Sequence, residues 1–218
     1  MTDTPLAVEQ KSPGRLRDGS RFFFDALRSR PVARRILSGF SIITAVVALG
    51  MLAYPLYTNY QQDRLQSKLA IQLHSPENKA AYAAGHTAEG DALTRLAIPA
   101  LNVDTVVVEG TGASALRAGA GHYPNTPLPG EEGNVAIAGH RTTYGKPFAN
   151  IDRLKVGDQI VLETPIGQHV YRVTRPPFVV ANNDFSVISQ TPGRSLTLTT
   201  CHPKGSTRQR LIVRAEKV

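Results

Sequence analysis

Short runs of β-branched and aliphatic residues, bounded by glycine or proline, fill the chain from Ala92 to its C-terminus. The clearest runs are residues 103–108, 134–138, 159–163, 169–173 and 195–200. Short strands at this spacing are typical of an antiparallel sandwich or barrel, and not of a parallel sheet with crossover helices. Only residues 114–118 and 147–151 are expected to form helical turns. The sequence therefore predicts an all-β domain over residues 92–218, large enough to bury one core without disulfides.

A long apolar segment separates this domain from a basic tail. Residues 36–57 carry no charge, and 22 residues are enough to cross a bilayer as a helix. The 35 residues before them hold eight Lys or Arg against four Asp or Glu, an excess that stays in the cytoplasm. A cleaved signal peptide is disfavoured because the apolar segment is too long and lacks a clear cleavage site. We therefore expect a single-pass membrane protein whose C-terminal domain is extracellular.

The remaining segment, residues 58–91, is polar and rich in Gln and Ala. Residues 61–69 can continue the helix, and Ser75-Pro76 and Gly85 interrupt it. The predicted organisation is a cytoplasmic tail (1–35), a transmembrane helix (36–57), an extracellular stalk that is partly helical and partly flexible (58–91), and the β domain (92–218).

The formal net charge of +8 does not indicate nucleic-acid binding. Half of it comes from the tail, eight basic minus four acidic residues, where attraction to anionic lipid accounts for the arginines. No helical recognition element or interleaving of aromatic and basic residues is present in the sequence. We expect no nucleic acid among the partners.

Cys201 is the only cysteine, so it cannot form an internal disulfide. It ends the run that begins at Ser195, in which Leu196 and Leu198 point to the opposite face of a strand. A structural cysteine is usually buried among apolar side chains, whereas this thiol lies away from the leucines at a strand end. Cys201 is therefore the candidate nucleophile.

A thiol nucleophile needs a base, and His140 is the best placed of six histidines. It follows the small-apolar run 134–139, and Gly139 leaves the neighbouring backbone unencumbered. His122 is the second choice. His202 follows the cysteine directly, so its side chain should point to the opposite face.

An arginine should return beside the thiol. Residues 208–214 alternate again, and Gly205 in the short preceding loop predicts an antiparallel hairpin. Arg208 and Arg210 share one face and compete for this place. Arginine suits the stabilisation of an oxyanion because it stays protonated and offers several fixed donors.

Together, the segments 138–141, 197–201 and 209–213 resemble the sortases, the cysteine transpeptidases of Gram-positive cell surfaces. The resemblance covers residues 92–218 and implies a closed eight-stranded β-barrel with its active site at the ends of adjacent strands. The segments 121–124 and 139–144 are most similar to class E, the housekeeping class of high-GC Gram-positive bacteria, which prefers the sorting signal LAXTG.

The resemblance also implies roles for individual residues. Cys201 matches the nucleophile, His140 the general acid and base, and Arg210 the oxyanion-stabilising arginine, chosen over Arg208 because it directly precedes the Leu-Ile-Val run. Tyr123 and Thr200 match residues that contact the substrate. No cofactor is implied. The calcium-binding cluster of some class A members has no clear match, since the adjacent carboxylates of residues 131 and 132 are typical of a solvated turn.

The implied reaction cleaves a C-terminal sorting signal, LAXTG or LPXTG in type, between Thr and Gly through a thioacyl enzyme. The partners would be surface proteins that carry the signal, a peptidoglycan precursor amine and the membrane. Two alternatives remain open from the residues: a membrane-tethered cysteine peptidase of another family, which would only hydrolyse, and a non-catalytic β-barrel binding module. The second would not need a cysteine, a histidine and an arginine together.

Overall fold

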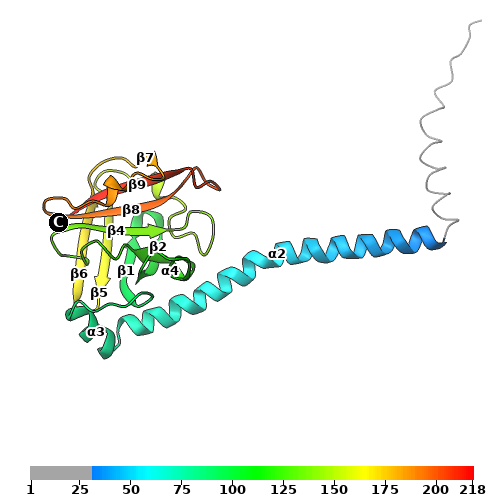
Figure 1. The fold of residues 1–218 in the computed structure, drawn as a ribbon, viewed down its shortest axis with the longest axis horizontal. Coiled ribbons are helices and arrows are strands. Elements are labelled where there is room, and N and C mark those ends of the chain that lie inside the picture. The colour runs from blue at the N-terminus through cyan, green and yellow to red at the C-terminus, as the bar shows by residue number, and fades with distance from the viewer. Residues whose placement is uncertain (1–30) are drawn as a thin grey trace, which may run out of the picture. The chain divides into compact units, whose positions relative to one another are not determined.

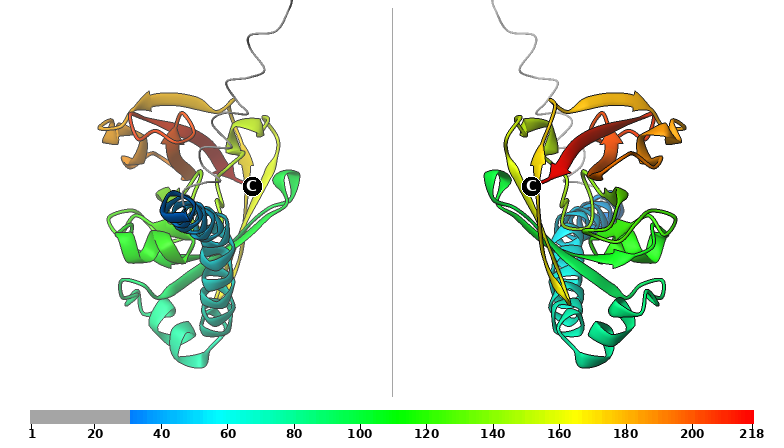
Figure 2. Two further views of the ribbon diagram at one scale, coloured as in Figure 1. Left: turned by 90° about the vertical axis from the view of Figure 1, so that its right-hand side faces the viewer. Right: turned by 90° about the vertical axis from the view of Figure 1, so that its left-hand side faces the viewer.

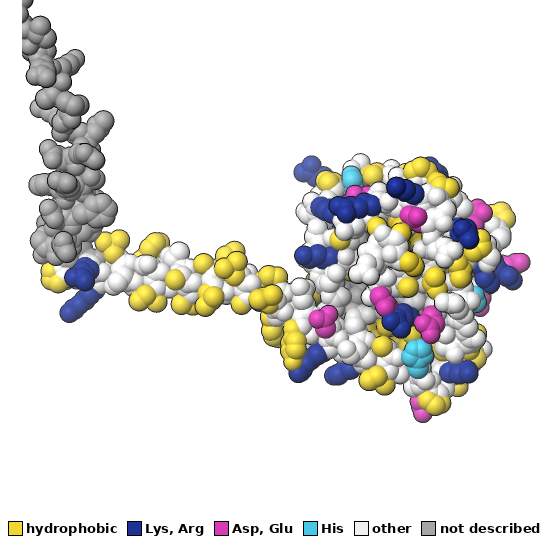
Figure 3. Space-filling view, turned by 180° about the vertical axis from the view of Figure 1, so that it is seen from behind, with side chains coloured by type: hydrophobic (Ala, Val, Ile, Leu, Met, Phe, Trp, Pro, Cys, Tyr) yellow, Lys and Arg dark blue, Asp and Glu magenta, His cyan; other side chains and the backbone are white. Residues whose placement is uncertain are grey.

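The computed structural model describes residues 31–218, which fall in two compact units, Met1–Tyr54 and Pro55–Val218. The first unit contributes the beginning of helix α2 (Pro31–Leu73), where apolar side chains such as Phe40, Leu49 and Leu52 are exposed (Figure 3). By length and composition this helix can cross a membrane, and the predicted span 36–57 lies within it. The predicted tail falls mostly on residues 1–30, outside the described residues.

The second unit is a β-barrel closed by eight strands, as the sequence predicts (Figure 1). Its hydrogen-bonded order is β6-β5-β1-β2-β3-β4-β8-β9, and pairing of β9 with β6 closes the circle. The bounds of these strands are β1 (Ala92–Ile98), β2 (Val103–Glu109), β3 (Ala120–His122), β4 (Gly133–Gly139), β5 (Gln159–Thr164), β6 (Gly167–Val173), β8 (Arg194–His202) and β9 (Gln209–Lys217). A ninth strand, β7 (Phe178–Ala181), pairs with the first part of β9 outside the circle.

Two pairings are parallel, β2 with β3 and β4 with β8, so the expectation of a purely antiparallel sheet is wrong at these places. Parallel neighbours need a crossover connection, and the short helix α4 (Ala113–Ala118) supplies it between β2 and β3. The connection from β4 to β8 contains β5, β6, β7 and the 3-10 helices η2 (Ile151–Arg153) and η3 (Phe185–Ile188). As a consequence, β4 and β8 end side by side at the same end of the barrel.

Side chains along β4, β8 and β9 point alternately into the barrel core and to the outer face of the barrel. The inward side chains of these strands are fully or almost fully buried in one cluster: Val135, Ile137, Leu196, Leu198, Leu211 and Val213. Burying each such side chain contributes about 1.5–3 kcal/mol. Because side chains alternate, the residues between them, including Thr199 and Cys201, are held on the outer face.

Residues 58–91, the predicted stalk, include the end of α2 and helix α3 (Pro76–Ala83), and both pack on the barrel within the second unit. Leu73 is fully buried against Ala92 and Val106. The Asn78 amide donates to the carbonyl oxygens of Ala92, at 2.9 Å, and Leu73, at 3.4 Å. Figure 2 shows α3 beside the last turns of α2. A buried polar side chain with backbone partners fixes this segment in place.

Candidate active site

Cys201 and Arg210 lie opposite each other in the β8–β9 hairpin. Arg210 Nη1 lies 3.8 Å from the Cys201 Sγ atom and also donates to the carbonyl oxygens of Thr207, at 3.0 Å, and Gln209, at 3.2 Å. These contacts hold the guanidinium beside the half-buried thiol. Arg208 precedes β9 and is exposed. Of the two competing arginines, the structure brings Arg210 to the sulfur.

His140 follows β4 immediately and lies beside the end of β8. Ala138 pairs with Thr199, so continuing the parallel register by two residues places His140 next to Cys201 on the same face. Its ring packs against the ring of Tyr144, with centroids 5.2 Å apart, and its carbonyl oxygen accepts a hydrogen bond from the Phe148 N–H. Burial lowers the pKa of His140 below the ordinary 6.5 because it disfavours the imidazolium.

Tyr123 reaches the same face from the loop after β3. Its hydroxyl lies 3.2 Å from the Thr199 Oγ1 atom, and Thr199 is the preceding outward-facing residue on the strand of Cys201. Tyr123 also lines a pocket of about 340 Å³, together with Thr111, Ile188 and Gln190. This pocket could hold part of an extended peptide that approaches the thiol.

Thr200 lies on the inner face and is buried. Its hydroxyl donates to the carbonyl oxygen of Gly139 at 2.7 Å, which ties the end of β8 to the end of β4. As placed, the hydroxyl does not face the outer side, where the thiol and Tyr123 lie. The placement therefore does not support the predicted contact of Thr200 with substrate and indicates a role in holding the two strand ends together.

His122, the second choice for the base, lies on the inner face opposite Ile137 of β4. It is 1% exposed, and both ring nitrogens are engaged. Nδ1 lies 2.9 Å from the Glu109 carboxylate, while Nε2 lies 2.9 Å from the Thr126 hydroxyl and 3.0 Å from the Pro127 carbonyl oxygen. These contacts exclude it as the base for Cys201.

Arg141 is a site residue that the sequence reasoning missed. It is 5% exposed, and its Nη1 lies 2.8 Å from His202 Nδ1 and 3.3 Å from the Cys201 carbonyl oxygen. Its Nη2 forms an ion pair with Asp152 at 3.2 Å. Arg141 thus joins the chain just after the histidine to the chain around the thiol. Strand alternation gives no signal for it because it lies in a loop.

Asn134 holds the loop that approaches the outer face, residues 176–193. This fully buried amide donates to the carbonyl oxygens of Val187, at 3.2 Å, and Ser189, at 3.1 Å. It accepts a hydrogen bond from the Thr197 hydroxyl at 2.7 Å. The sequence could have indicated this role, because an asparagine within an apolar strand is expected to be buried and a buried amide needs hydrogen-bond partners. Within the same loop, the Asp184 side chain caps η3.

Within residues 31–218, no group of three or more His, Cys, Asp or Glu side chains is placed to hold a metal ion. One carboxylate oxygen of Glu131 accepts a hydrogen bond from the Leu128 N–H at 2.9 Å, as in an ordinary turn. The chemistry available at the site is therefore that of a thiol, an imidazole and a guanidinium at adjoining strand ends.

Comparison with known proteins identifies relatives of this arrangement. The model of the sortase domain family matches residues 96–218. Sortase SrtE1 of Streptomyces coelicolor is 32% identical over 198 residues, which cover 84% of this chain and 56% of that protein. Sortase D of Bacillus subtilis is 35% identical over 133 residues, which cover 59% of this chain and 65% of that protein. The chain therefore spans less than two thirds of either relative.

Solved structures agree with the sequence comparisons. The Sortase D5 transpeptidase of Clostridium perfringens has a TM-score of 0.63 and 30% identity, over 72% of this chain and 98% of that one. Sortase E of Streptomyces avermitilis has a TM-score of 0.55 and 38% identity, over 60% and 90%. These matches confirm the resemblance to the sortases that the motifs indicated. With its closed barrel and with Cys201 and Arg210 paired across one hairpin, the chain belongs to the sortase family.

Proposed function

We propose that this protein is a membrane-anchored transpeptidase that cleaves a sorting signal between Thr and Gly and joins the protein to a cell-wall precursor amine. The observation that carries the proposal is the approach of Arg210 to the Cys201 sulfur at 3.8 Å, in a chain of the sortase family. Cys201, His140 and Arg210 form the proposed catalytic set. Neither a simple peptidase nor a binding module accounts for this set and this family together.

In the first half-reaction, the Cys201 thiolate attacks the carbonyl carbon of the signal's threonine. The proton that the thiol loses goes to His140, a role supported by the β4–β8 register, which brings the positions of His140 and Cys201 together at the strand ends. The carbonyl oxygen becomes an oxyanion, which the Arg210 guanidinium stabilises. When the C–N bond breaks, His140 gives its proton to the departing glycine amine, and a thioester remains on Cys201.

The second half-reaction returns the enzyme to its starting state. An incoming amine attacks the thioester carbon, His140 accepts a proton from it, and Arg210 again stabilises the oxyanion. The C–S bond then breaks, and the thiolate is restored. Water can replace the amine, so slow hydrolysis is an expected side reaction.

The sorting signal would approach along the outer face between Tyr123 and the loop 176–193. Tyr123 is the proposed reader of the signal, because it contacts Thr199 and lines the adjoining pocket. The likeness to the Streptomyces sortases supports class E. For a member of that class we expect a preference for LAXTG over LPXTG. The expected clients are surface proteins that end in such a signal.

The proposed arrangement of the whole chain places residues 36–57 in the membrane as a single anchor. The excess of basic residues in 1–35 orients this anchor with the N-terminus in the cytoplasm and residues 58–218 outside. The barrel would then meet its protein substrates and the precursor amine at the outer surface of the membrane.

Incubating the protein with LAXTG or LPXTG peptides, with and without a primary amine, tests the proposal. We expect cleavage after threonine and, when the amine is present, a product that carries the amine, with LAXTG the better substrate. Hydrolysis alone at every amine concentration would assign a peptidase instead. Equal use of both peptides would remove the class E assignment and leave the transpeptidase in place.

A further inference from the structure

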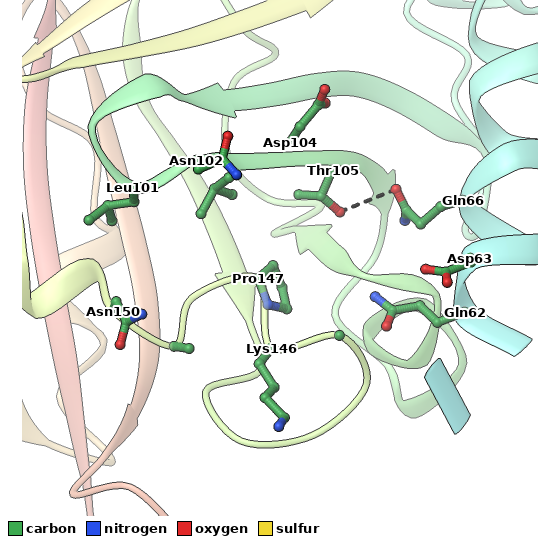
Figure 4. A pocket seen from close by; sticks show the side chains of 13 residues that line it. Gln62, Asp63, Gln66, Leu101, Asn102, Asp104, Thr105, Lys146, Pro147 and Asn150 are labelled. Carbon is green, nitrogen blue, oxygen red and sulfur yellow. Dashed lines mark hydrogen bonds between the residues drawn. The ribbon is translucent and has the colours of Figure 1, made fainter. Parts of the chain in front are cut away.

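Figure 4 shows a polar pocket of about 370 Å³. Its lining includes none of the proposed catalytic residues. Three segments form its walls. The first is the part of α2 around Gln62 and Asp63, and the second is the β1–β2 turn with the start of β2, which includes Asn102. The third is the loop after His140, which includes Lys146 and Asn150. All of these elements belong to the second unit. The chemistry of this lining indicates what the pocket can bind.

Gln66, on the wall of the pocket, shows how this helix recognises a peptide group. Its Oε1 accepts a hydrogen bond from the Val106 N–H at 2.6 Å, and its Nε2 donates to the Val106 carbonyl oxygen at 3.2 Å. Pairing of β2 with β3 begins only at Val107, so the glutamine amide takes the place of a neighbouring strand at Val106. A side-chain amide offers one acceptor and two donors, which match a peptide group at two points.

Gln62 presents the same amide one helical turn earlier, at the i and i+4 spacing that places two residues on one face. It is 7% exposed and lines the pocket, and its amide rests against Gly145. Among the residues that the structure describes, Gln62 has no hydrogen-bond partner, unlike Gln66. The donor and the acceptor of its amide are thus open to a ligand, and a peptide group satisfies both.

The other lining residues are mostly polar and fit the peptide portion of a ligand. Asn102 and Asn150 add further amides, and the charged lining groups are the Asp63 and Asp104 carboxylates and the Lys146 ammonium. No aromatic side chain lines the pocket, so it lacks the flat apolar face on which a sugar ring would stack. We therefore assign the ligand as a peptide and not as a carbohydrate.

Two loops connect the pocket to the catalytic strand ends. The loop from His140 returns at Phe148, whose N–H donates to the His140 carbonyl oxygen at 3.1 Å, and its next residues line the pocket. Asn150 accepts a hydrogen bond at 3.1 Å from Lys204, in the loop that follows Cys201. We propose that the pocket binds the peptide portion of the amine acceptor, with Gln62 pairing to one of its peptide groups. This inference rests on the proposed transpeptidase function.

The test compares two acceptors with the full chain in detergent. Trialanine offers an amine and peptide groups, whereas methylamine offers an amine alone. Gln62→Ala should raise the trialanine concentration for half-maximal transfer about tenfold, as expected for lost hydrogen bonds, and leave methylamine transfer and thioester formation unchanged. Gln62→Glu keeps the side-chain shape but lacks the amide donor, so it should show the same selective loss.

Gln61→Ala is the matched control, because Gln61 is exposed and its amide donates only to the neighbouring Tyr57 hydroxyl. It should behave as the unchanged protein does with both acceptors. Calorimetric titration of trialanine into the resting protein tests the pocket without catalysis, and Gln62→Ala should weaken this binding by the same factor. Wild-type trialanine affinity and transfer in both Gln62 variants would overturn the assignment. Trialanine binding that depends on Gln62, in a protein that forms no thioester, would instead refute the proposed function.

Discussion

At the scale of single residues, alternation along a strand predicted much of the site. Placing Leu196 and Leu198 on one face put Cys201 on the other, and the hairpin around Gly205 predicted an arginine beside the thiol. Alternation could not decide between Arg208 and Arg210, because residues two apart on a strand point to the same face. The start of β9 at Gln209 separates them, since only Arg210 lies within the paired strand.

The two arginines should therefore differ in their effect on turnover. Arg210→Ala should slow acylation by about a hundredfold or more, the usual cost of losing a preorganised oxyanion donor. Arg208→Ala should change it only slightly, because the side chain is exposed. Lysine at position 210 should restore little, because it lacks the rigid fork of donors. Single-turnover acylation on folded variants measures the effect, and the reverse ranking would assign the role to Arg208.

The lowered pKa of His140 makes stability depend on pH. The unfolded chain protonates this imidazole near 6.5, whereas the folded protein does so only at lower pH. The unfolded state thus binds more protons as the pH falls below about 6.5, and the free energy of unfolding decreases until the folded pKa is passed. His140→Gln should lose less stability than the unchanged protein between pH 7.5 and 5.5 in urea unfolding.

His169 provides a control for this measurement, since burial and nearby positive charges also lower its pKa. His169→Gln should likewise flatten the pH dependence but leave acylation intact. An identical pH dependence in His140→Gln and the unchanged protein would show that His140 titrates normally in the folded state.

At the scale of elements, the sequence predicted the six longer strands of the barrel from residue 103 onward, but of their pairings only the antiparallel hairpin of β8 and β9. Strand β3 was missed because it has only three residues, one of them Gly121. The parallel pairing of β4 with β8 was missed because it joins segments about 60 residues apart, and no local pattern reports it. That pairing nevertheless brings His140 beside Cys201, so the site depends on the contact that was hardest to predict.

Arg141 should stabilise the neighbouring ends of β4 and β8, where His140 and Cys201 lie. Its guanidinium contacts the Cys201 carbonyl oxygen, His202 and Asp152. A hydrogen bond to a charged group contributes about 1.5–3 kcal/mol, so Arg141→Met should lower the free energy of unfolding by at least that amount. Arg153→Met, a change in the same loop region at an exposed residue, is the control in urea unfolding. Equal stability of both variants would show that the Arg141 contacts do not support the fold.

At the scale of the whole molecule, the end of α2 is part of the folded unit that holds the site. Its contacts with the barrel through Leu73, Asn78 and Gln66 were not predicted, because a few apolar residues in a polar segment do not reveal their partner. The apolar segment before them could be identified from the sequence, since an uncharged run of that length is typical of a membrane span.

A shortened chain tests whether the end of α2 and helix α3 stabilise the barrel. The segment 92–218 lacks the Leu73 side chain and leaves the Val106 peptide group without Gln66, so it should melt about 5–10 °C below the segment 55–218. Thermal unfolding followed by circular dichroism measures the difference. Equal melting temperatures would show that α2 and α3 rest on the barrel without stabilising it.

The central claim is that Cys201 carries the acyl group, and the mass of the intact protein tests it most directly. Mixed with a LAXTG peptide and stopped in acid, the protein should gain the mass of the fragment that ends at threonine. Hydroxylamine should remove this mass, as it does from a thioester, and Cys201→Ala should never acquire it. The same adduct on Cys201→Ala, or cleavage of that peptide at a normal rate by this variant, would contradict the account.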